Sequence, residues 1–542
     1  CIGLSGTFNP HSFCDALHNT SNIGACCNLT GISDEDLDEL LDGARFGTDV
    51  AEDPQLRAER YDDIWRTLAE EAYSSITHFD LATAVTSTDV HGFTMWPFNE
   101  GIFGYNLYSP QDEQAIWLDS DSEAGDSDVS DLVEGGTLRG ALAANVDSFD
   151  PPHSSDTTST MAQGFLFDGL TVNDSQGNIY PWLAEEFELL DVQEVDDRIE
   201  AYGEYMRTVD VDEDGVPQTD DYPIIQGAPE DGEVDVLTHE DARDAAADGT
   251  YGMHYRYHLQ EGVEFHNGDE FTAEDVVATY EYAEDSEIAP QTYDSVLAVV
   301  EVDEYTVDMY AQVADAEGER ELPGLLILNS TQIDEIEKGS LDPREGNVPI
   351  GTGPYEFDEF EDEQFYEVDK FDDYWVEQKG VEEAFSWFDG SGDFPDGPVI
   401  DRVELEVVPD DATRSGALQN DEVDITYGIA TGTLDDFDAD DGFLVHGVET
   451  GGYEYIQYPV NIEPWDDRRI RQAVNHLVPR QQIVDNVLNG WGRPAWTDLP
   501  ELAHGSGTVD HDALEEEIRP MNEYDPEKAE ELLEEVAADH AE

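Results

Sequence analysis

The sequence predicts a large α/β protein built from several domains. At 542 residues the chain is long enough for roughly three or four domains of about 100 to 200 residues each. Hydrophobic residues make up 39% and aromatic residues 10% of the chain, enough to fill cores of that size. Residues 136–142 and 255–259 alternate as strands do, whereas residues 33–44 and 54–73 carry apolar residues at helical spacing, the latter with Tyr61, Ile64, Trp65 and Leu68 on one face. Ser33 is the expected N-cap of the first helix, and Thr272 with Asp275 is the expected cap of a later one.

An acidic stretch at residues 119–136 separates two parts that look folded. It reads DSDSEAGDSDVSDLVEGG and has no aromatic residue. Its sizeable apolar residues are Val129, Leu132 and Val133, too few to offset the entropy cost of ordering the stretch. We therefore expect a flexible linker.

The net charge indicates where the protein works and excludes two kinds of partner. With 130 Asp and Glu against 23 Lys and Arg, the formal charge is −107. Such a chain repels nucleic acid and anionic lipid, so neither is expected as a partner. Because the carboxylates are spread through every segment, we interpret them as a halophilic surface adapted to molar salt, where the Debye length falls to about 3 Å.

Four cysteines, Cys1, Cys14, Cys26 and Cys27, lie in the first 27 residues. They form no C-x-x-C pair and have no histidine set at zinc spacing, which favours disulfides in an oxidising exterior. A bond from Cys14 to Cys26 or Cys27 closes a loop of about a dozen residues, worth about 3 kcal/mol. Since Cys26 and Cys27 cannot both pair with Cys14, one of the two is left to pair with Cys1 or stays free.

The sequence also favours an extracellular location. No apolar run of about 18 residues could span a membrane, and no signal peptide is present. A mature chain that starts at Cys1 is what a processed lipoprotein shows, so a lipid anchor at the cell surface is one expectation. The alternative is that the chain merely begins there.

One segment of the acidic region 191–250 copies the start of a calcium loop. The pattern D-x-D-x-D-G places oxygen ligands at alternate positions around one cation. The candidate ligands are Asp210, Asp212, Asp214 and Asp221. Since Asp221 replaces the usual glutamate and the chain is acidic throughout, chance is the competing explanation. Calcium is the one cofactor that the sequence suggests.

Five motifs in order resemble one known family. They are FHNGDEFTAEDV within 255–283, GTGPYEFDEF at 351–360, DKFDDYWVE at 369–377, ALQNDEVDITYG at 417–428 and the helix around DDRRIRQAV within 463–495. Together they resemble the extracellular solute-binding proteins, family 5, which serve peptide-type ABC importers. The stretch GGTLRGALAANVDSFDPPHSSDT is similar to the first strand of that family, so the match opens at the linker and runs to residue 542.

The order of the segments differs from that of the family. Residues 1–117 resemble the closing part of the family's chain, with NPHSF followed by a cysteine pair, SDEDLDELLDGAR, a long helix and VHGFTMWP. Some family members have a disulfide at the place of Cys14 with Cys26 or Cys27. The resemblance therefore implies a rotated order, as in circular permutation. A tandem array, completion of one subunit by its neighbour and a missing segment remain alternatives.

The resemblance implies a periplasmic-binding-protein-like fold (type II, cluster C), a two-lobed Venus flytrap with an extra domain. The implied divisions are residues 1–90, the later part of the last lobe; 91–118, the closing segment of the first lobe; 119–136, the linker; 137–180, the start of the first lobe; 181–310, the extra domain with its insertion 191–250; 311–450, the first lobe continued; and 451–542, the last lobe's first part. We expect residues 1–90 and 452–542 to pack into one domain, because each carries an apolar stripe that needs a partner. The N-terminal stripe is Leu37, Leu40, Leu41, Ile64, Trp65 and Leu68, and the C-terminal stripe is Ile470, Val474, Leu477, Val487, Leu532 and Leu533.

The resemblance also suggests residues at the binding cleft. Peptide binders of the family hold the ligand ammonium with an aspartate at the place of Gly6, so a free peptide amine is not expected to be the main anchor. The candidate ligand-binding positions are Gly6, Phe8, Trp96, Ser148, Phe149, Tyr453 and Tyr455. For each of the side chains, packing in a core is the competing interpretation.

The function implied is binding of a peptide-like or other small solute and its delivery to membrane permease subunits of an ABC importer. Catalysis is not expected, because G-x-S-x-G, H-E-x-x-H, P-loop and dinucleotide-binding motifs are absent from the sequence. His266, in the FHNGD turn, is expected to be structural. The alternative function is a surface or filament protein that self-assembles through the same fold.

Overall fold

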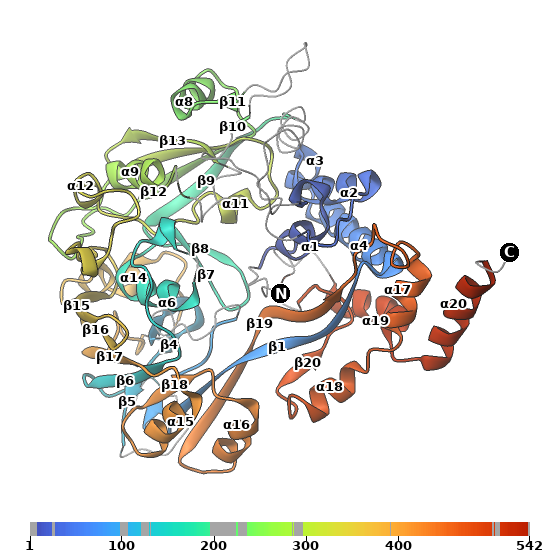
Figure 1. Cartoon of the computed structure of the whole chain (residues 1–542). Coiled ribbons are helices and arrows are strands. Elements are labelled where there is room, and N and C mark those ends of the chain that lie inside the picture. The colour runs from blue at the N-terminus through green and yellow to red at the C-terminus, as the bar shows by residue number, and fades with distance from the viewer. Residues whose placement is uncertain are drawn as a thin grey trace.

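The computed structural model describes most of the chain. The described residues are 8–23, 28–97, 107–120, 129, 132–154, 156–195, 224–225, 236–284, 286, 296–390, 392–500, 503 and 510–539. They form two lobes and an extra domain, which we call the sheet lobe, the helical lobe and the extra domain (Figure 1). The predicted mixed α/β architecture is therefore confirmed.

The sheet lobe is built on a mixed sheet of eight strands. Its order is β15, β16, β17, β6, β18, β1 and β19, and β20 pairs with β1. The strands are β1 (Ser74–Ser87), β6 (Thr137–Leu142), β15 (Tyr355–Glu361), β16 (Phe365–Lys370), β17 (Arg402–Val407), β18 (Ile425–Tyr427), β19 (Phe443–Gln457) and β20 (Gly492–Pro494). β6 runs parallel to β17 and β18, and the other pairs are antiparallel. The helices packed on it are α6 (Thr157–Leu166), α15 (Asp411–Gln419) and α16 (Thr431–Asp438).

The glycines of the GTGPY motif explain how this lobe closes around α6. A Cβ on Gly351 would lie 1.9 Å from the carbonyl oxygen of Leu166, and one on Gly353 would lie 2.5 Å from the carbonyl carbon of Leu166. Only glycine allows two backbones to approach so closely. The following Tyr355 is fully buried and meets Phe165 of α6 edge to face. The motif thus fastens β15 to the end of α6.

The extra domain has an antiparallel sheet in the order β13, β14, β12, β9. Its strands and helices are β9 (Ala184–Val192), β12 (Met253–Leu259), β13 (Val296–Asp303), β14 (Thr306–Ala311), α8 (His239–Ala247) and α9 (Ala273–Ala283). β12 buries every second residue, as its alternation predicts. The N-terminus of α9 has the predicted capping box, in which Thr272 and Asp275 satisfy each other's backbone N–H groups.

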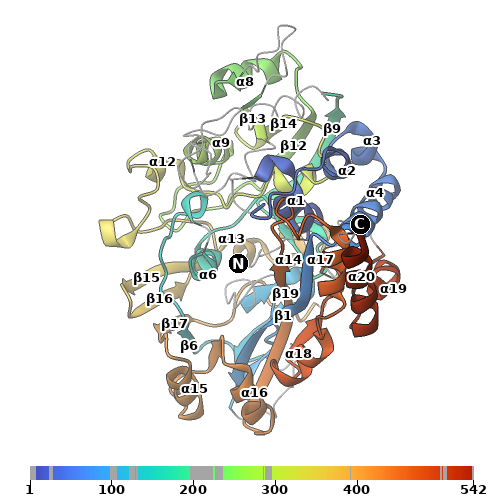
Figure 2. The ribbon, with the colours of Figure 1, turned by 45° about the vertical axis from the view of Figure 1, so that its right-hand side comes forward.

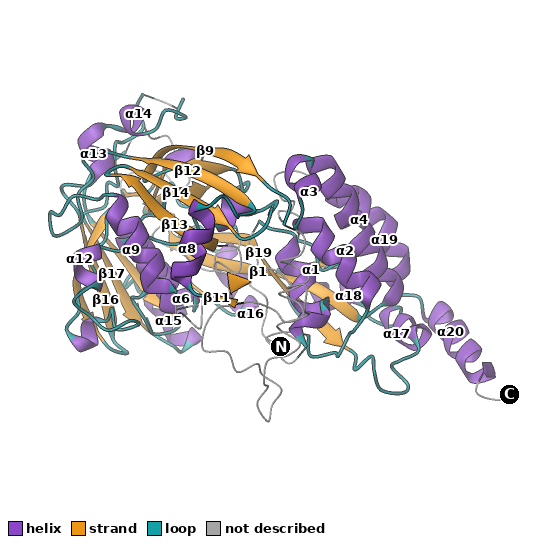
Figure 3. Ribbon diagram, turned by 90° about the horizontal axis from the view of Figure 1, so that it is seen from above, coloured by secondary structure: helices purple, strands orange, loops and turns teal. Residues whose placement is uncertain are grey.

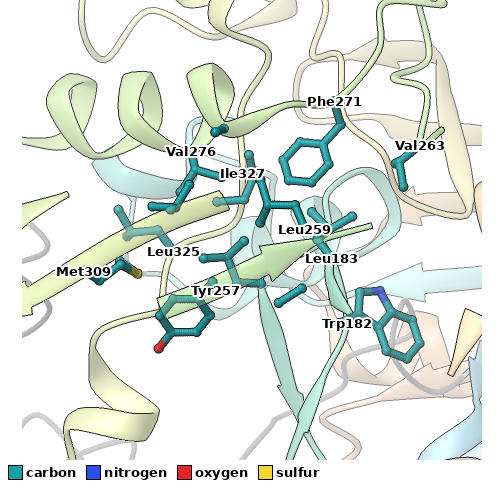
Figure 4. Close-up of a cluster of buried hydrophobic side chains, with 14 of the residues drawn as sticks. Trp182, Leu183, Tyr257, Leu259, Val263, Phe271, Val276, Met309, Leu325 and Ile327 are labelled. Atoms are coloured by element: carbon teal, nitrogen blue, oxygen red, sulfur yellow. The ribbon is translucent and has the colours of Figure 1, made fainter. Parts of the chain in front are cut away.

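The core of the extra domain reaches into neighbouring segments. Figure 4 shows Tyr257, Leu259 and Met309 from the sheet packed against Val276 of α9 and against Ile327. Trp182 lies at one end of this core and stacks on Phe385 at 4.4 Å between ring centres. Because Leu325 and Ile327 belong to the same core, the segment that follows β14 is fixed to the extra domain.

The remaining short elements connect these parts. They are β2 (Val90–His91), β3 (Tyr108–Ser109), β4 (Gln114–Ala115), β5 (Trp117–Leu118), β7 (Thr171–Asn173), β8 (Ile179–Pro181), β10 (Ile224–Ile225), β11 (Val236–Leu237), α11 (Gly318–Glu321), α12 (Ser330–Ile333), α13 (Trp375–Lys379) and α14 (Val381–Ala384).

The helical lobe is assembled from both ends of the chain (Figure 2). Its helices are α1 (His11–His18), α2 (Glu35–Arg45), α3 (Thr48–Glu52), α4 (Pro54–Glu71), α17 (Arg468–Asn475), α18 (Arg480–Asn486), α19 (His511–Asn522) and α20 (Pro526–Asp539). Seen from above, they form one group beside the sheets (Figure 3). The core contains Leu41, Ile64 and Trp65 from the first part and Leu514 and Ile518 from the last part. The expected packing of residues 1–90 with 452–542 is therefore confirmed.

Two details of this lobe differ from the sequence prediction. The N-cap of α2 is Asp34 and not Ser33, because the Asp34 carboxylate accepts the N–H groups of Asp36 and Leu37. The expected C-terminal stripe is also wrong in part, since Leu477, Val487 and Leu533 are 44%, 67% and 43% exposed. The residues that serve instead are Tyr453, Ala495, Leu499, Ala503, Leu514 and Ile518.

Candidate functional site

Two strands carry the chain between the helical lobe and the rest of the described residues. β1 pairs with β19 along most of its length, and the pair has register shifts at Ile76/His78 and Phe79/Leu81. β1 pairs with β18 through Ala84–Thr86 and with β20 through His78–Asp80, next to the register shifts. The irregular middle of this pair is the natural pivot between the lobes.

The predicted residues Tyr453 and Tyr455 lie on β19 at this pivot. Tyr453 is buried in the core of the helical lobe, edge to face with Phe79 at 6.1 Å between ring centres. Among the described residues, its hydroxyl has no hydrogen-bond partner. Tyr455 is partly buried beside it, with ring centres 5.4 Å apart. The pair therefore joins the core of one lobe to the strand that leads to the other.

A histidine on the sheet-lobe half of β19 was missed by the sequence analysis. His446 Nε2 lies 2.9 Å from the Thr86 hydroxyl, and its ring meets Phe93 edge to face at 4.9 Å. Burial lowers the pKa of His446 to about 4, so the ring is neutral near pH 7. It stabilises the sheet-lobe end of the β1–β19 pair as a neutral hydrogen-bonding group.

The predicted residue Phe8 lies where the N-terminal segment meets the extra domain. The guanidinium of Arg320 stands 5.6 Å above its ring, and the Phe8 side chain packs closely on Gly177 of the β7–β8 hairpin. The next residue, Asn9, donates a 3.0 Å hydrogen bond to Glu321. Gly6, the position of the family's ammonium anchor, lies outside the described residues.

Arg320 lies at this meeting point beside two carboxylates, Glu321 and Glu317, the latter with its Oε2 3.5 Å from Arg320 Nε. It donates to the carbonyl oxygen of Gly177 at 2.8 Å and to the side chain of Asn173. Burial lowers the pKa of Arg320, which nonetheless stays charged because the guanidinium is so basic. A planar guanidinium beside an aromatic ring suits a carboxylate or carbonyl group of a solute.

The other three predicted binding residues are placed separately. Phe149 lies in the core of the sheet lobe, with its ring centre 5.2 Å from that of Phe360. This position agrees with the competing interpretation of Phe149 as a core residue. The Ser148 hydroxyl accepts a 3.1 Å hydrogen bond from the N–H of Asp150 and stabilises the turn. Trp96 is buried before the residues left undescribed at 98–106.

Two further predictions concern cysteine and calcium. Cys14 is a buried free thiol whose Sγ lies 3.5 Å from the carbonyl oxygen of His11, so the predicted disulfide is absent at this residue. Burial raises the pKa of the Cys14 thiol. Cys26, Cys27 and the four calcium candidates (Asp210, Asp212, Asp214 and Asp221) lie outside the described residues. Within the described part, no group of three His, Cys, Asp or Glu could hold a metal.

A second contact, which joins the helical lobe to the extra domain, was not predicted from the sequence. Arg45 and Arg57 of the helical lobe pair with Asp315 and Glu317, which follow β14 of the extra domain. Carboxylates carry little information in so acidic a chain, but arginine is scarce, so the two arginines were the sequence signal that could have indicated this contact.

Among the described helices, none has both the length and the apolar character needed to cross a bilayer.

Comparison with known proteins identifies the family. The family model for bacterial extracellular solute-binding proteins, family 5 Middle, matches residues 179–539, about two thirds of the chain. The glutathione-binding protein GsiB of Pectobacterium atrosepticum is 25% identical over 301 residues, which cover 55% of this chain and 52% of the relative. The oligopeptide-binding protein AppA of Bacillus subtilis is 27% identical over 294 residues, which cover 53% and 49%. The chain thus spans about half the length of the curated relatives it matches.

Solved structures of similar proteins were also found. The structure of AppA from Bacillus subtilis in complex with a nonapeptide gives a TM-score of 0.45 at 20% identity, over 74% of this chain and 64% of that one. NikA from Brucella suis in complex with Fe(III)-EDTA gives 0.47 at 18% identity with the same coverage. The matched family is defined by solute binding and not by catalysis. By the family match, the chain belongs to the bacterial extracellular solute-binding proteins, family 5.

Proposed function

We propose that this protein captures a peptide-like solute outside the cell and delivers it to the membrane permease of an ABC importer. The observation that carries the proposal is the family match over residues 179–539. Relatives named for binding oligopeptides and glutathione support a peptide-like solute. A lipid on Cys1 would keep such a receptor near its permease.

The arrangement of the lobes suits capture by closure. Two long strands, β1 and β19, connect the helical lobe to the sheet lobe, and their pairing has register shifts at Ile76/His78 and Phe79/Leu81. A solute that contacts both lobes binds the closed form better and shifts the population toward it. Tyr455 at the pivot and Phe8 beneath Arg320 lie where the lobes meet, and we propose that they contact the solute.

The recognition chemistry differs from that of a free-amine binder. Gly6 supplies no carboxylate for an ammonium group, while Arg320 places a positive charge beside Phe8. We therefore expect the solute to be held through carbonyl or carboxylate oxygens and apolar surface. Blocking the N-terminal amine of a peptide should leave its affinity within about threefold, because less than 1 kcal/mol then depends on that amine.

The rotated segment order is proposed to be a circular permutation. The two ends of the acidic linker 119–136 lie close together, since a Cβ on Gly136 would be 3.4 Å from the side chain of Leu118. The N–H of Gly135 already bonds to the carbonyl of Val399 beside β17. Such a linker joins two nearby ends without strain.

The alternative of a self-assembling surface protein is less favoured. It would place the contacts between residues 1–90 and 452–542 at subunit boundaries. Those contacts are made within one chain, in a shared core. A receptor that functions as a single chain is the simpler account of this packing.

A thermal-shift screen in molar salt tests the proposal. Di-, tri- and oligopeptides are compared with their N-acetylated forms and with oligosaccharides as the control class. At 100 times Kd a solute adds about 2.7 kcal/mol to the free energy of unfolding, which raises the melting temperature by several degrees. A folded sample that responds to no peptide would overturn the proposal.

A further inference from the structure

The helical lobe touches the extra domain through a short backbone pairing. The N–H of Gly47 donates to the carbonyl of Ala314 at 2.8 Å, and the N–H of Ala316 donates to the carbonyl of Arg45 at 2.9 Å. Phe46 and Asp315 thus form an antiparallel bridge between segments that are about 270 residues apart. Nothing covalent holds the two segments together at this point.

Two buried ion pairs flank the bridge. Arg45 donates two parallel hydrogen bonds to the Asp315 carboxylate, from Nε to Oδ1 at 3.0 Å and from Nη2 to Oδ2 at 2.8 Å. Arg57 pairs with Glu317, and both side chains are at most 5% exposed. Arg57 Nη1 also donates to the carbonyl of Ala316 at 3.4 Å. Bidentate, desolvated pairs are both strong and geometrically selective.

The contact lies away from the pivot. In Figure 1, β1 and β19 cross the lower half of the molecule, whereas α2 and α3 lie in the upper half, near the extra domain. Thr48, at the start of α3, also bonds to Glu194 just beyond β9. Rotation about the hinge strands would therefore separate Arg45 from Asp315 while leaving the chain connected.

We propose that the Arg45–Gly47 and Ala314–Glu317 segments form a latch that holds the helical lobe against the extra domain, away from the hinge, and must open for solute to enter or leave. This inference rests on the proposed function, because a latch has a use only if the lobes move. The charged groups are buried, so molar salt screens the latch far less than it screens surface pairs. Such a latch suits a halophilic receptor.

Hydrogen exchange in the free protein tests the latch without any solute. The amides of Gly47 and Ala316 report on the latch, and those of Trp65 in α4 and Tyr257 in β12 report on the two cores. The latch predicts that Gly47 and Ala316 exchange at least tenfold faster than Trp65 and Tyr257 in the wild type, by local opening. Equal rates for all four amides would overturn it, since the contact would then open only on global unfolding.

A pair of matched variants sharpens the test. Asp315→Asn removes one latch carboxylate, and Asp308→Asn removes the carboxylate of an equivalent pair inside the extra domain, where Arg256 binds Asp308 at 2.7 and 2.8 Å. The latch predicts a further tenfold or larger acceleration at Gly47 and Ala316 in Asp315→Asn alone. Acceleration of all four amides alike in Asp315→Asn would contradict it.

The outcome separates this inference from the proposed function. Fast local exchange at Gly47 and Ala316 supports a latch whether or not a peptide is found in the thermal screen. With a solute in hand, saturation should slow both amides at least tenfold and leave Trp65 and Tyr257 unchanged. A bound solute that leaves Gly47 and Ala316 unprotected would overturn the latch but not the receptor.

Discussion

The indole N–H of Trp65 donates a 2.5 Å hydrogen bond to the carboxylate of Asp498, a residue 433 positions further along the chain. Both side chains are buried in the helical lobe. Burial raises the pKa of Asp498, and the indole bond acts in the opposite direction. One buried polar contact thus joins the two ends of the sequence.

Loss of this bond should destabilise the helical lobe. Trp65→Phe keeps an aromatic ring but leaves the Asp498 carboxylate without its indole donor. We expect the free energy of unfolding to fall by about 2 to 4 kcal/mol. The buried carboxylate loses one donor, at about 1 to 3 kcal/mol, and the smaller phenyl ring leaves part of the indole volume unfilled. Urea denaturation in molar salt measures the change. A loss below 1 kcal/mol would show that the bond is unimportant.

A second contact between the chain ends depends on arginine geometry. Arg471 donates from Nη2 to the carbonyl of Glu71 at 2.7 Å, from Nε to that of Ala72 at 3.2 Å and from Nη1 to that of Trp465 at 2.7 Å. Arg471→Lys cannot reach all three, so it should cost about 1 to 3 kcal/mol of folding free energy. Arg468→Lys is the matched control on the same helix, because its pair with Glu71 is exposed and worth at most about 1 kcal/mol. Equal effects of the two substitutions in urea denaturation would refute this explanation.

The stability should fall between pH 6.5 and 4, in part through His266. Its Nδ1 accepts the N–H of Gly351 at 3.2 Å, and its Nε2 donates to the carbonyl of Gly353 at 3.1 Å, the structural role expected from sequence. Burial lowers the pKa of His266 from 6.5 to about 4. The unfolded chain therefore binds more protons in this window, and stability that is full above pH 6.5 is lost as the pH falls toward 4.

Replacement of His266 should make that pH dependence shallower. The lowered pKa of His266 corresponds to a change of about 3 kcal/mol in the free energy of unfolding, at 1.36 kcal/mol per pKa unit. His266→Gln retains a donor and an acceptor but does not titrate. Urea denaturation at several pH values should show a smaller decline from pH 6.5 to 4 in the variant than in the wild type. Identical declines would mean that His266 is not the titrating group.

Low salt should unfold the protein. The formal charge of −107 is screened over about 3 Å in 1 M salt but over about 10 Å in 0.1 M salt, so repulsion between carboxylates grows on dilution. Circular dichroism should lose its helical signal on dialysis into dilute buffer and regain it when KCl is restored. Sucrose is the control, because it stabilises compact states without screening charge. Full ellipticity in dilute buffer would contradict this prediction.

Features that depend on local sequence patterns could be predicted from the sequence. The alternation of Met253–Leu259, the capping box at Thr272 and the helical face of Tyr61, Ile64, Trp65 and Leu68 are all present. Such features depend on neighbours a few residues away, so their residue types and spacing are enough. The shared core of the chain ends was also predictable, since neither amphipathic half could bury its face alone.

Contacts between residues far apart in the chain could not be predicted from the sequence. Nothing near Arg45 indicates Asp315 as its partner, because nearly every segment offers carboxylates. The exposed face of α20 was misjudged for a related reason. Leu532 packs on Ala473 and Ala529, whereas its neighbour Leu533 points to solvent, and an apolar stripe alone does not say how much of a helix is covered.

Isothermal titration calorimetry in molar salt tests the central claim most directly. The protein is titrated with the peptide that gives the largest thermal shift, and with its N-acetylated form. The account predicts saturable binding of one peptide per chain, with a negative heat-capacity change from the apolar surface buried on closure, and affinities within about threefold for the two forms. The absence of saturable heat from a folded sample, or binding that requires the free amine, would contradict it.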